Sequence, residues 1–362
     1  MKIDFSIVDT TQFMMHQHII DGEVCTLIQP QHIGAKWTSE NKIFRSSLWN
    51  SGGELISASF CKFVNWGENP ENFPVPTSLK NTNIVEKIDG SLLIVSKWKG
   101  KYILRTRGTV DAHKLDNGHE LALFEQDILP NIKDNDDTWS ASYLFEWTSP
   151  SQRIILNYGD IPNWYLIGIV RHEDYSLVSQ DELNEFASYN FMKRPPCYTF
   201  PDVPSLMAQV ELWKGKEGVV VYSKNDQVLH KVKALEYLVK HRFKSEATLE
   251  NTLELYFSMG KLPYQEFERK LIETFDHECF EMVRGFASNI CDANKQVQQI
   301  ISGINTFVED TLKPLHSRRE QAEKVLSAYS TTNRASMVFT RLDGKTLSDD
   351  QVKKLFWQLL KK

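Results

Sequence analysis

Residues 83–98, NIVEKIDGSLLIVSKW, contain two apolar, β-branched runs separated by Asp89-Gly90. Such runs are typical of β-strands, and Asp-Gly between two of them is a strong signal for a two-residue hairpin turn. Lys87 stands at the end of the first run, directly before the turn. The sequence therefore predicts a β-hairpin whose tip presents a lysine. A lysine at this position is also common at solvated hairpin ends, so the stretch alone does not identify a function.

Short runs of strand-forming residues continue from this stretch as far as about residue 240. Polar or Pro/Gly-rich connectors, such as residues 69–78 and 193–204, separate the runs and predict a domain rich in short strands. The further strand candidates are residues 101–110, 141–147, 153–158, 164–170, 217–223 and 227–233.

After about residue 240 the apolar residues recur at helical spacing, first in residues 234–243. Ser245 is a candidate N-cap for the segment that follows it, and Pro263 is expected to open another helix. Near the end of the chain, Ser348 and Gln351 have the spacing of a capping box. Helical spacing thus predominates in the last third of the chain.

The fold class predicted from these patterns is α+β. An N-terminal domain over residues 1–243 is followed by an all-α C-terminal domain over residues 244–362. A length of 362 residues agrees with two domains at roughly 150 residues each.

The amino-acid composition limits the classes of protein to which this chain can belong. Apolar residues make up 41% and charged residues 25%, which is ordinary for a globular protein. No apolar run approaches the roughly 20 residues that span a bilayer, and Asp4 interrupts the start of the chain where a secretory signal needs an apolar core. We therefore expect a cytoplasmic protein with no membrane partner. The net charge of −5 means that any nucleic-acid binding must use local basic clusters.

Charged residues stand in or beside the strand-like runs, where an ordinary half-buried strand would be poorer in them. Lys87-Ile88-Asp89-Gly90 is the first of these positions. The others, in chain order, are Arg105-Thr106-Arg107-Gly108, Phe145-Glu146-Trp147, Trp164-Tyr165 through Arg171, Glu217-Gly218 and Lys231-Val232-Lys233.

In order and spacing, this set resembles the motifs of the covalent nucleotidyltransferase superfamily, which includes ligases and RNA capping enzymes. Lys87-Ile88-Asp89-Gly90 looks like its motif I and Phe145-Glu146 like its motif III. Glu217-Gly218 looks like motif IV, and Lys231-Val232-Lys233 like motif V.

A closer resemblance is to the phage-type RNA ligase 1 family of ATP-dependent tRNA-repair ligases, over about residues 40–245. Arg45 in IFRSSLW looks like the arginine upstream of the nucleophile. Lys62 lies in SFCKFVNWGENPENF, which is similar to an aromatic-rich run of the family, and YLFEWTSPSQRIILNY resembles its glutamate motif. The fold that this implies is a nucleotidyltransferase domain of ATP-grasp-like antiparallel sheets with helices. The helical C-terminal domain is then a candidate for RNA or tRNA specificity.

The resemblance implies an RNA-repair reaction that joins a 3′-hydroxyl to a 5′-phosphate in three nucleotidyl transfers, through lysyl-AMP and RNA-adenylate. It implies ATP as cofactor, with AMP bound covalently to Lys87, and Mg²⁺ or alternatively Mn²⁺. The implied partners are RNA ends, a nicked tRNA anticodon loop and a separate end-healing kinase–phosphatase. If the chain is phage-encoded, its location is the cytoplasm of the host cell.

Residue roles carry over from the same resemblance. Lys87 is the nucleophile, Glu217 holds the catalytic metal through water, and Glu146 contacts the ribose. Lys231 and Lys233 are assigned to the α-phosphate, and Arg45 and Lys62 to the outer phosphates. Arg107, and less securely Arg105, are assigned to the nucleotide pocket. Asp89 and Gly90 shape the turn, and Trp164 or Tyr165 lines the base pocket.

The chemistry requires an unusual lysine, because a free lysine with a pKa near 10.4 is protonated at neutral pH and is a poor nucleophile. Neighbouring cations lower the pKa of an amine. We therefore expect Arg107, Lys231, Lys233 and a bound metal to lower the pKa of Lys87.

Two other kinds of protein stay open at this point. One is a DNA ligase or mRNA guanylyltransferase of the same superfamily, although those families usually continue into an OB-fold rather than helices. The other is a catalytically silent module that binds RNA ends. The residues do not distinguish ATP from GTP. A basic cluster from Lys231 to Lys244 is a candidate RNA contact, or simply a solvated helix face.

Overall fold

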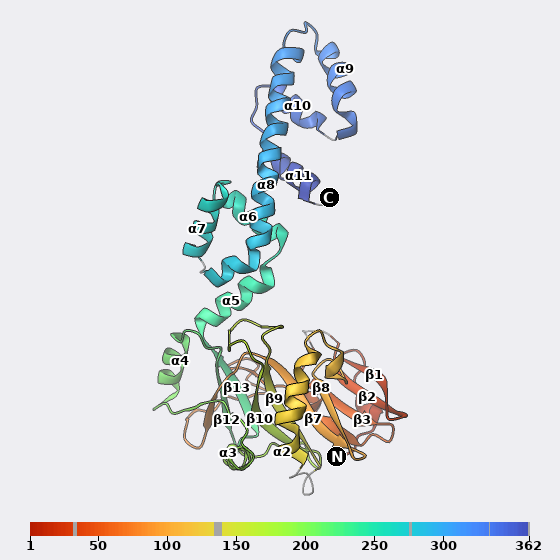
Figure 1. The fold of residues 1–362 in the computed structure, drawn as a ribbon, viewed down its shortest axis with the longest axis vertical. Helices are drawn as coiled ribbons and strands as arrows, with labels where there is room; N and C mark the ends of the chain where they lie inside the picture. Colours follow the sequence, from red (N-terminus) through yellow and green to blue (C-terminus); the bar gives the residue numbers. More distant parts are fainter. Residues whose placement is uncertain (32–34, 134–139, 275–276, 333, 361–362) are drawn as a thin grey trace. The chain divides into compact units, whose positions relative to one another are not determined.

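A computed structural model describes residues 1–31, 35–133, 140–274, 277–332 and 334–360. Contacts divide the chain into two compact units, Met1–Val239 and Lys240–Lys362, each of which is seen in Figure 1. The division falls inside helix α5 (Leu235–Glu246), which also contains the expected domain boundary at 243/244. The first unit is α+β and the second is helical, so the predicted fold class is confirmed.

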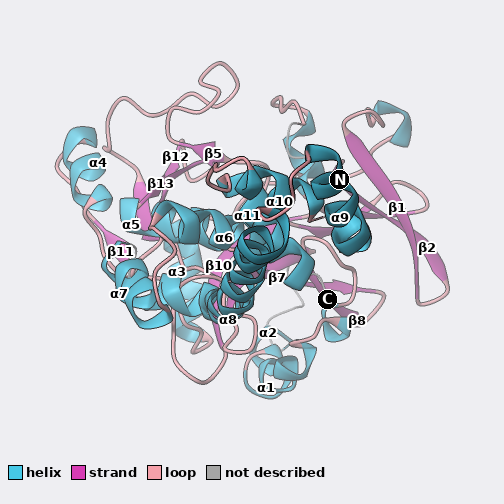
Figure 2. Cartoon of the chain, turned by 90° about the horizontal axis from the view of Figure 1, so that it is seen from above, coloured by secondary structure: helices cyan, strands magenta, loops and turns pink. Residues whose placement is uncertain are grey.

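The first sheet of the N-terminal unit has the strand order β1-β2-β3-β4, and every neighbouring pair is antiparallel. Its strands are β1 (Phe13–Ile20), β2 (Glu23–Pro30), β3 (Ser47–Asn50) and β4 (Leu55–Ala58). Figure 2 shows β1 and β2 as a long paired ribbon. The sequence patterns did not indicate these four strands.

A second antiparallel sheet has the order β10-β9-β7-β8. Helices α1 (Leu121–Asp127), α2 (Leu129–Lys133) and α3 (Gln180–Tyr189) pack on it through a shared apolar core. Its strands are β7 (Ser91–Trp98), β8 (Lys101–Thr106), β9 (Ala141–Thr148) and β10 (Asn163–Arg171), all of which overlap predicted strands.

The third sheet has the order β11-β6-β12-β13-β5, in which only the β13–β5 pair is parallel. Helix α4 (Val203–Glu211) packs beside β12 and β13. The strands are β5 (Val64–Asn65), β6 (Asn83–Glu86), β11 (Cys197–Tyr198), β12 (Gly218–Ser223) and β13 (Val228–Lys233). The short 3₁₀ helices of the chain are η1 (Phe5–Ile7), η2 (Asn41–Arg45), η3 (Ala112–Lys114), η4 (Gly118–Glu120) and η6 (Ser330–Thr332).

The hairpin predicted at Asp89-Gly90 is wrong. β6 pairs with β11 and β12 in the third sheet, whereas β7 pairs with β8 and β9 in the second. The Asp-Gly pair therefore carries the chain from one sheet to another. Neither residue has the positive φ that a two-residue hairpin turn of this kind requires. The chain reverses elsewhere because the best strand partners of residues 83–86 come from much later in the sequence.

A second strand prediction, residues 153–158, is also wrong, because this segment forms turns and loop. Its apolar residues Ile155 and Leu156 are buried against Ala234 and Tyr237. Their backbone N–H groups are bonded to a side chain, the carboxylate of Asp89, rather than to a neighbouring strand. An apolar run can therefore be buried without joining a sheet.

Apolar side chains from all three sheets meet in one core. Trp49 of the first sheet, Ile94 of the second and Val85 of the third are each 4% exposed or less, so this core excludes water. Burial of large side chains such as these is the main favourable term in folding. The core therefore holds the ends of the three sheets in fixed positions relative to one another.

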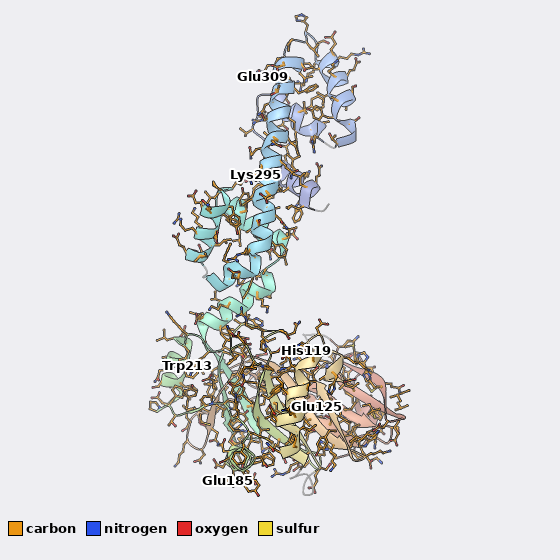
Figure 3. All side chains as sticks on the ribbon, viewed as in Figure 1. His119, Glu125, Glu185, Trp213, Lys295 and Glu309 are labelled. Carbon is orange, nitrogen blue, oxygen red and sulfur yellow. The ribbon has the colours of Figure 1, made fainter. Side chains whose placement is uncertain are left out.

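The C-terminal unit is a helical bundle whose members pack on the long helix α8 (His277–Phe307). Figure 3 shows Lys295 and Glu309, which are exposed on the solvent side of α8 and of the π-helical turn η5 (Val308–Leu312) that follows it. An apolar stripe of α8, made of Val297, Ile300, Ile301, Ile304 and Phe307, faces the core. The other helices are α6 (Leu249–Ser258), α7 (Tyr264–Thr274), α9 (Arg318–Tyr329), α10 (Ala335–Leu342) and α11 (Asp349–Leu360).

Helix ends in this unit largely follow the sequence. Pro263 precedes α7, and the Ser348–Gln351 capping box is present, with reciprocal bonds of 3.1 and 3.3 Å. The N-cap of α6 is Thr248 rather than Ser245, because α5 continues through Ser245 to Glu246. No helix within the described residues is both long and apolar enough to cross a bilayer.

Candidate active site

A cavity of about 1040 Å³ lies where the three sheets meet. This volume is at the upper end of the range for small-molecule sites. Side chains from each sheet and from η2 line it. The predicted site residues among its lining are Arg45, Lys62, Lys87, Gly90, Arg107, Glu146, Lys231 and Lys233. Asp89 and Glu217 are not part of the lining. Glu217 is bonded to two lysines that are, and Asp89 stands in the chain between the lining residues Ile88 and Gly90.

Glu217 binds two lysines at once. Its Oε2 accepts a hydrogen bond from Lys87 Nζ at 2.7 Å, and its Oε1 lies 2.9 Å from Lys233 Nζ. The carboxylate is 3% exposed, whereas each lysine side chain is 21% exposed. Two charge-assisted contacts compensate the buried carboxylate and fix both ammonium groups at the cavity wall.

Strand geometry explains how these side chains come together. Lys231 and Lys233 are two residues apart on β13, so both point to the same side of the sheet. Lys233 pairs with Gly218 of β12 in the register. Gly218 has φ +142°, and a Cβ there would lie 2.1 Å from the carbonyl oxygen of Val232. Glycine after Glu217 is therefore required for β12 and β13 to approach this closely.

Four further cations face the cavity without a carboxylate partner. Within the described residues, no ion pair joins Arg45, Lys62, Arg107 or Lys231 to an acidic side chain. Nη1 of Arg45 is buried and has no hydrogen-bond partner. Buried polar groups are normally satisfied, so this guanidinium is arranged for an acceptor that the protein itself does not supply.

Crowding of these cations changes their acid–base behaviour. Burial, followed by repulsion from Arg45 and from Lys233, lowers the pKa of Lys231 to about 7. Burial and then the charge of Arg107 lower the pKa of Arg45 to about 10. An anion in the cavity would relieve both repulsions. The cavity is therefore electrostatically suited to a polyanion such as a triphosphate.

Aromatic rings line the same wall. The guanidinium of Arg45 lies 4.8 Å from the ring centre of Phe63, and Lys231 Nζ lies 5.2 Å from it. Lys62 Nζ lies 5.4 Å from the ring of Trp37. Such contacts hold unpaired cations in place. Lys62 is among the predicted site residues and these rings are not, although Phe63 directly follows Lys62 in the aromatic-rich run.

The Asp89-Gly90 turn is fixed by its own side chain. Asp89 Oδ2 accepts hydrogen bonds from the backbone N–H groups of Ile155 and Leu156 at 2.7 and 2.8 Å. Its Oδ1 accepts from the hydroxyl of Tyr237 at 2.7 Å, and its own N–H donates to the hydroxyl of Tyr158 at 2.9 Å. The two tyrosines were missed because only the fold brings them to Asp89.

Gly90 lies against β9. Its N–H donates to Glu146 Oε1 at 3.1 Å, and a Cβ at this position would lie 2.5 Å from the carbonyl oxygen of Trp147. No real side chain tolerates that distance from backbone, so the approach of Lys87 to Glu146 depends on glycine. Burial raises the pKa of Glu146 to about 7, despite the opposing charge of Lys87.

The pKa of Lys87 does not follow the sequence expectation. Burial lowers it, but the negative charges of Glu217 and Glu146 outweigh burial and raise the pKa above its ordinary value. The expectation of a pKa lowered by neighbouring cations is therefore wrong for the protein alone. It missed the two carboxylates, of which Glu217 is bonded directly to the amine at 2.7 Å.

Three of the weaker candidates lie away from the cavity. Trp164 is 6% exposed and packs in the core against Phe124. Tyr165 contacts the ring of Tyr158. Arg105 is fully buried and bonded to Ser46 and Ser57. None of the three is in the lining of this cavity.

A metal site is not preformed here. Among the described residues, no group of three or more His, Cys, Asp or Glu side chains could hold an ion. Both oxygens of Glu217, the predicted metal ligand, are bonded to lysines. The residues fit a nucleotide triphosphate, but by themselves they do not fit a metal ion.

Comparison with known proteins agrees with the sequence motifs. Residues 43–248, more than half of the chain, match the sequence model of a family described as RNA ligase. That range begins just before Arg45 and ends after Lys233.

One curated relative is a protein of Autographa californica nuclear polyhedrosis virus that is predicted to be a bifunctional polynucleotide kinase/RNA ligase. The two are 29% identical over 215 residues, which is 53% of this chain. The chain spans 30% of the length of that relative.

Solved structures with some likeness are also RNA ligases. An archaeal ATP-dependent RNA ligase has a TM-score of 0.48 at 12% identity, over 76% of each chain. An RNA ligase from Naegleria gruberi has a TM-score of 0.41 at 14% identity, over 67% of this chain and 83% of its own. TM-scores below 0.5 do not establish a common fold.

Proposed function

Because this chain belongs to the RNA ligase family, we propose that it is an ATP-dependent RNA ligase. In this proposal it joins an RNA 3′-hydroxyl to a 5′-phosphate through a lysyl-AMP and an RNA-adenylate. Lys87 is the nucleophile, and the cavity around it binds the nucleotide.

The observation that carries the proposal is the charge arrangement of the cavity. One lysine that is paired with a carboxylate, Lys87, opens into the same space as four cations that have no acidic partner, Arg45, Lys62, Arg107 and Lys231. Four positive charges match the charge of a nucleotide triphosphate. A general anion site would not need a lysine with an adjacent base.

In the first transfer, the lone pair of Lys87 Nζ forms a bond to the α-phosphorus of ATP, and the bond from phosphorus to the pyrophosphate oxygen breaks. The ammonium must lose a proton before it attacks. Glu217 Oε2, 2.7 Å away, is positioned to accept that proton. The four unpaired cations offset the negative charge that gathers on the leaving pyrophosphate.

Lys231 and Lys233 are assigned to the α-phosphate, and Glu146 to the ribose. Glu146 is already bonded to the N–H of Gly90 in the same turn as Lys87, so a ribose held by this carboxylate would lie beside the nucleophile. Both assignments rest on the family resemblance and on the position of these residues around one cavity.

Mg²⁺, with Mn²⁺ as an alternative, is the metal that we propose. Since Glu217 is the single acidic ligand predicted for it, the ion would arrive bound to phosphate oxygens and meet Glu217 through water, which suits a hard cation. The ion would supply further positive charge at the transferring phosphate. The attack of Lys87 and the proton transfer to Glu217 do not require the ion.

The substrate is proposed to be RNA, and a nicked tRNA anticodon loop is the narrower form of that proposal. The basic cluster expected to contact RNA has little support, because Lys240 is 9% exposed and Arg242 is paired with Glu246 at 3.0 Å. A separate end-healing kinase–phosphatase and a cytoplasmic location also remain predictions. Sealing of a nicked tRNA stem-loop can be compared with sealing of unstructured RNA, and equal rates would remove the case for tRNA.

Covalent labelling tests the proposed function. The protein is incubated with Mg²⁺ and α-labelled ATP, denatured, and examined for label on the polypeptide. Parallel reactions contain α-labelled GTP, a metal chelator, the Lys87→Ala variant, or the Lys80→Ala variant as a control for an exposed lysine outside the cavity.

Label from ATP that is lost in Lys87→Ala and retained in Lys80→Ala is the expected result. Label from GTP alone would move the assignment to capping chemistry. If folded protein free of bound AMP takes up no label from either nucleotide, the ligase proposal is wrong and a silent RNA-end-binding module is favoured.

A further inference from the structure

Arg105 is a fully buried arginine that lies outside the cavity. It stands on β8 and is 0% exposed. Within the part of the chain that the structure describes, no carboxylate pairs with it. Burial lowers its pKa to about 10, so the guanidinium keeps its charge at neutral pH.

All five N–H groups of this guanidinium are used. Nε donates to Ser57 Oγ at 2.7 Å, and Nη2 donates to the carbonyl oxygens of Ser46 and Ser57, each at 3.1 Å. Nη1 donates to Ser46 Oγ at 2.8 Å and to the carbonyl oxygen of Thr106 at 3.1 Å. Ser46 and Ser57 belong to the first sheet region and Arg105 to the second sheet, so one side chain joins the two.

These bonds end beside two of the unpaired cations of the cavity. Ser46 directly follows Arg45 in the chain. The hydroxyl of Ser46 accepts from Arg105 and donates to the carbonyl oxygen of Arg107 at 2.8 Å. A continuous chain of hydrogen bonds therefore runs from Arg105 through Ser46 to the backbone of Arg107, and it also fixes the backbone next to Arg45.

Packing alone does not explain this residue. Burying a charge without an opposite charge is unfavourable, and an apolar side chain of similar volume is often at least as stabilising. A buried charge at this position is explained if function requires the backbone that is bonded to Arg105 to stay in place.

We propose that Arg105 is a positioning residue. It fixes Arg45 and Arg107, which come from different parts of the chain, at the separation that the triphosphate of ATP requires. This inference rests on the proposed function, because it assumes that these two cations bind the nucleotide. Arg105 itself touches neither the cavity nor the nucleotide.

Ser46→Ala tests the proposal with less risk to folding than a change at Arg105, because it removes one hydroxyl and keeps the buried charge. Ser223→Ala is the matched control. Ser223 is also a buried serine whose hydroxyl donates to a backbone carbonyl oxygen, that of Val228 at 3.2 Å, and it lies outside both the cavity lining and the hydrogen bonds of Arg105. Both variants are expected to lower the unfolding temperature.

Equilibrium binding of ATP, measured by fluorescence without the covalent step, gives the deciding readout. Ser46→Ala is expected to raise the Kd for ATP about threefold to tenfold, the loss of one hydrogen bond, whereas Ser223→Ala leaves it within twofold. Arg105→Lys, which cannot make the forked contacts, is expected to raise the Kd at least as much as Ser46→Ala.

A double-mutant cycle shows whether the effect passes through Arg107. In an Arg107→Ala background, Ser46→Ala should raise the Kd by a smaller factor than in the unaltered protein, because one of the two positioned side chains is already absent and only Arg45 remains. If Ser46→Ala binds ATP like Ser223→Ala, or if its effect is undiminished in the Arg107→Ala background, the positioning role is wrong. If the unaltered protein binds no ATP, the proposed function fails and this inference fails with it.

Discussion

Lys87 Nζ lies 2.7 Å from Glu217 Oε2, so the proposed nucleophile is already paired with a base inside the protein. The same carboxylate also binds Lys233. Because this environment raises the pKa of Lys87, the amine is protonated in the free protein. Activation must therefore come with the nucleotide, when charge in the cavity changes and the proton can leave.

Glu217→Gln separates the two effects of this carboxylate. The amide cannot accept the proton of Lys87, and we expect labelling with ATP to fall by about 10²-fold or more, a typical contribution of a general base. Because the negative charge that raises the pKa of Lys87 is gone, the residual rate should reach its plateau at a lower pH. Labelling rates measured between pH 6 and 10 check both effects.

Glu86→Gln is the control for that experiment, since Glu86 is a neighbouring acid that pairs with Lys216 at 2.8 Å rather than with Lys87. Its pH profile should resemble that of the unaltered protein. A Glu217→Gln variant with an unchanged profile would show that this carboxylate does not control the nucleophile.

Lys231 should make ATP binding dependent on a proton. With a pKa of about 7 in the free protein, this lysine is mostly neutral at pH 8. Phosphate groups favour its charged form and raise its pKa, so binding at pH 8 should take up a proton, with little uptake at pH 5.5. Calorimetry in buffers of different ionisation enthalpy measures this uptake.

Lys231→Met is expected to lose most of that proton uptake. Glu146→Gln is the necessary companion variant, because the pKa of Glu146 is also raised to about 7. Uptake that persists in Lys231→Met and disappears in Glu146→Gln would assign the proton to Glu146 instead.

Glu146→Gln should also stabilise the protein at alkaline pH. The pKa of this carboxyl is raised from 4.5 to about 7 in the folded state, so the folded state binds the proton more tightly. The free energy of unfolding therefore falls as pH rises from 4.5 through 7, and above pH 7 the whole decrease is present. We expect the variant to gain up to about 3 kcal/mol of unfolding free energy at pH 8 and almost nothing at pH 4.5.

Denaturant unfolding at the two pH values measures this gain. Glu185→Gln is the control, because Glu185 is exposed on α3 (Figure 3) and should show no such difference. Equal stability of Glu146→Gln and the unaltered protein at both pH values would contradict the raised pKa.

Gly90→Ala should abolish labelling. The new Cβ would lie 2.5 Å from the backbone oxygen of Trp147, so the turn that carries Lys87 has to move away from Glu146. Gly285→Ala makes the same chemical change in α8, where nothing lies within 4 Å of the added carbon. It should keep labelling intact and raise the unfolding free energy by up to about 1 kcal/mol. Normal labelling by Gly90→Ala would show that the close approach is not required.

Local patterns predicted the strands that carry the site, because each combines β-branched residues with a charged position at its end. They failed where partners are distant. β1 to β4 were missed, and residues 83–98 were read as a hairpin because nothing local reveals that β6 pairs with residues 197–198 and 219–222. The apolar segment 153–158 was taken for a strand because its true partner is a side chain, that of Asp89.

The order of the motifs along the sequence predicted the candidate site more completely than local patterns predicted the fold. Eight of the named residues line one cavity, and two more lie beside them. The sequence could not show that Glu217 bridges two lysines, because that pairing joins residues 130 positions apart. Nor could the sequence show that Arg107 faces the cavity whereas Arg105, two residues earlier in the same run, is buried outside it.

The placement of β6 has a consequence for biosynthesis. Lys87 leaves the ribosome well before the partners of its strand, since β12 ends at Ser223. At a translation rate of about 5–20 residues per second, roughly 7–27 s pass between the two. A nascent chain thus carries its reactive lysine for that interval without Glu217 beside it, and it becomes competent to use ATP only when β12 and β13 complete the sheet.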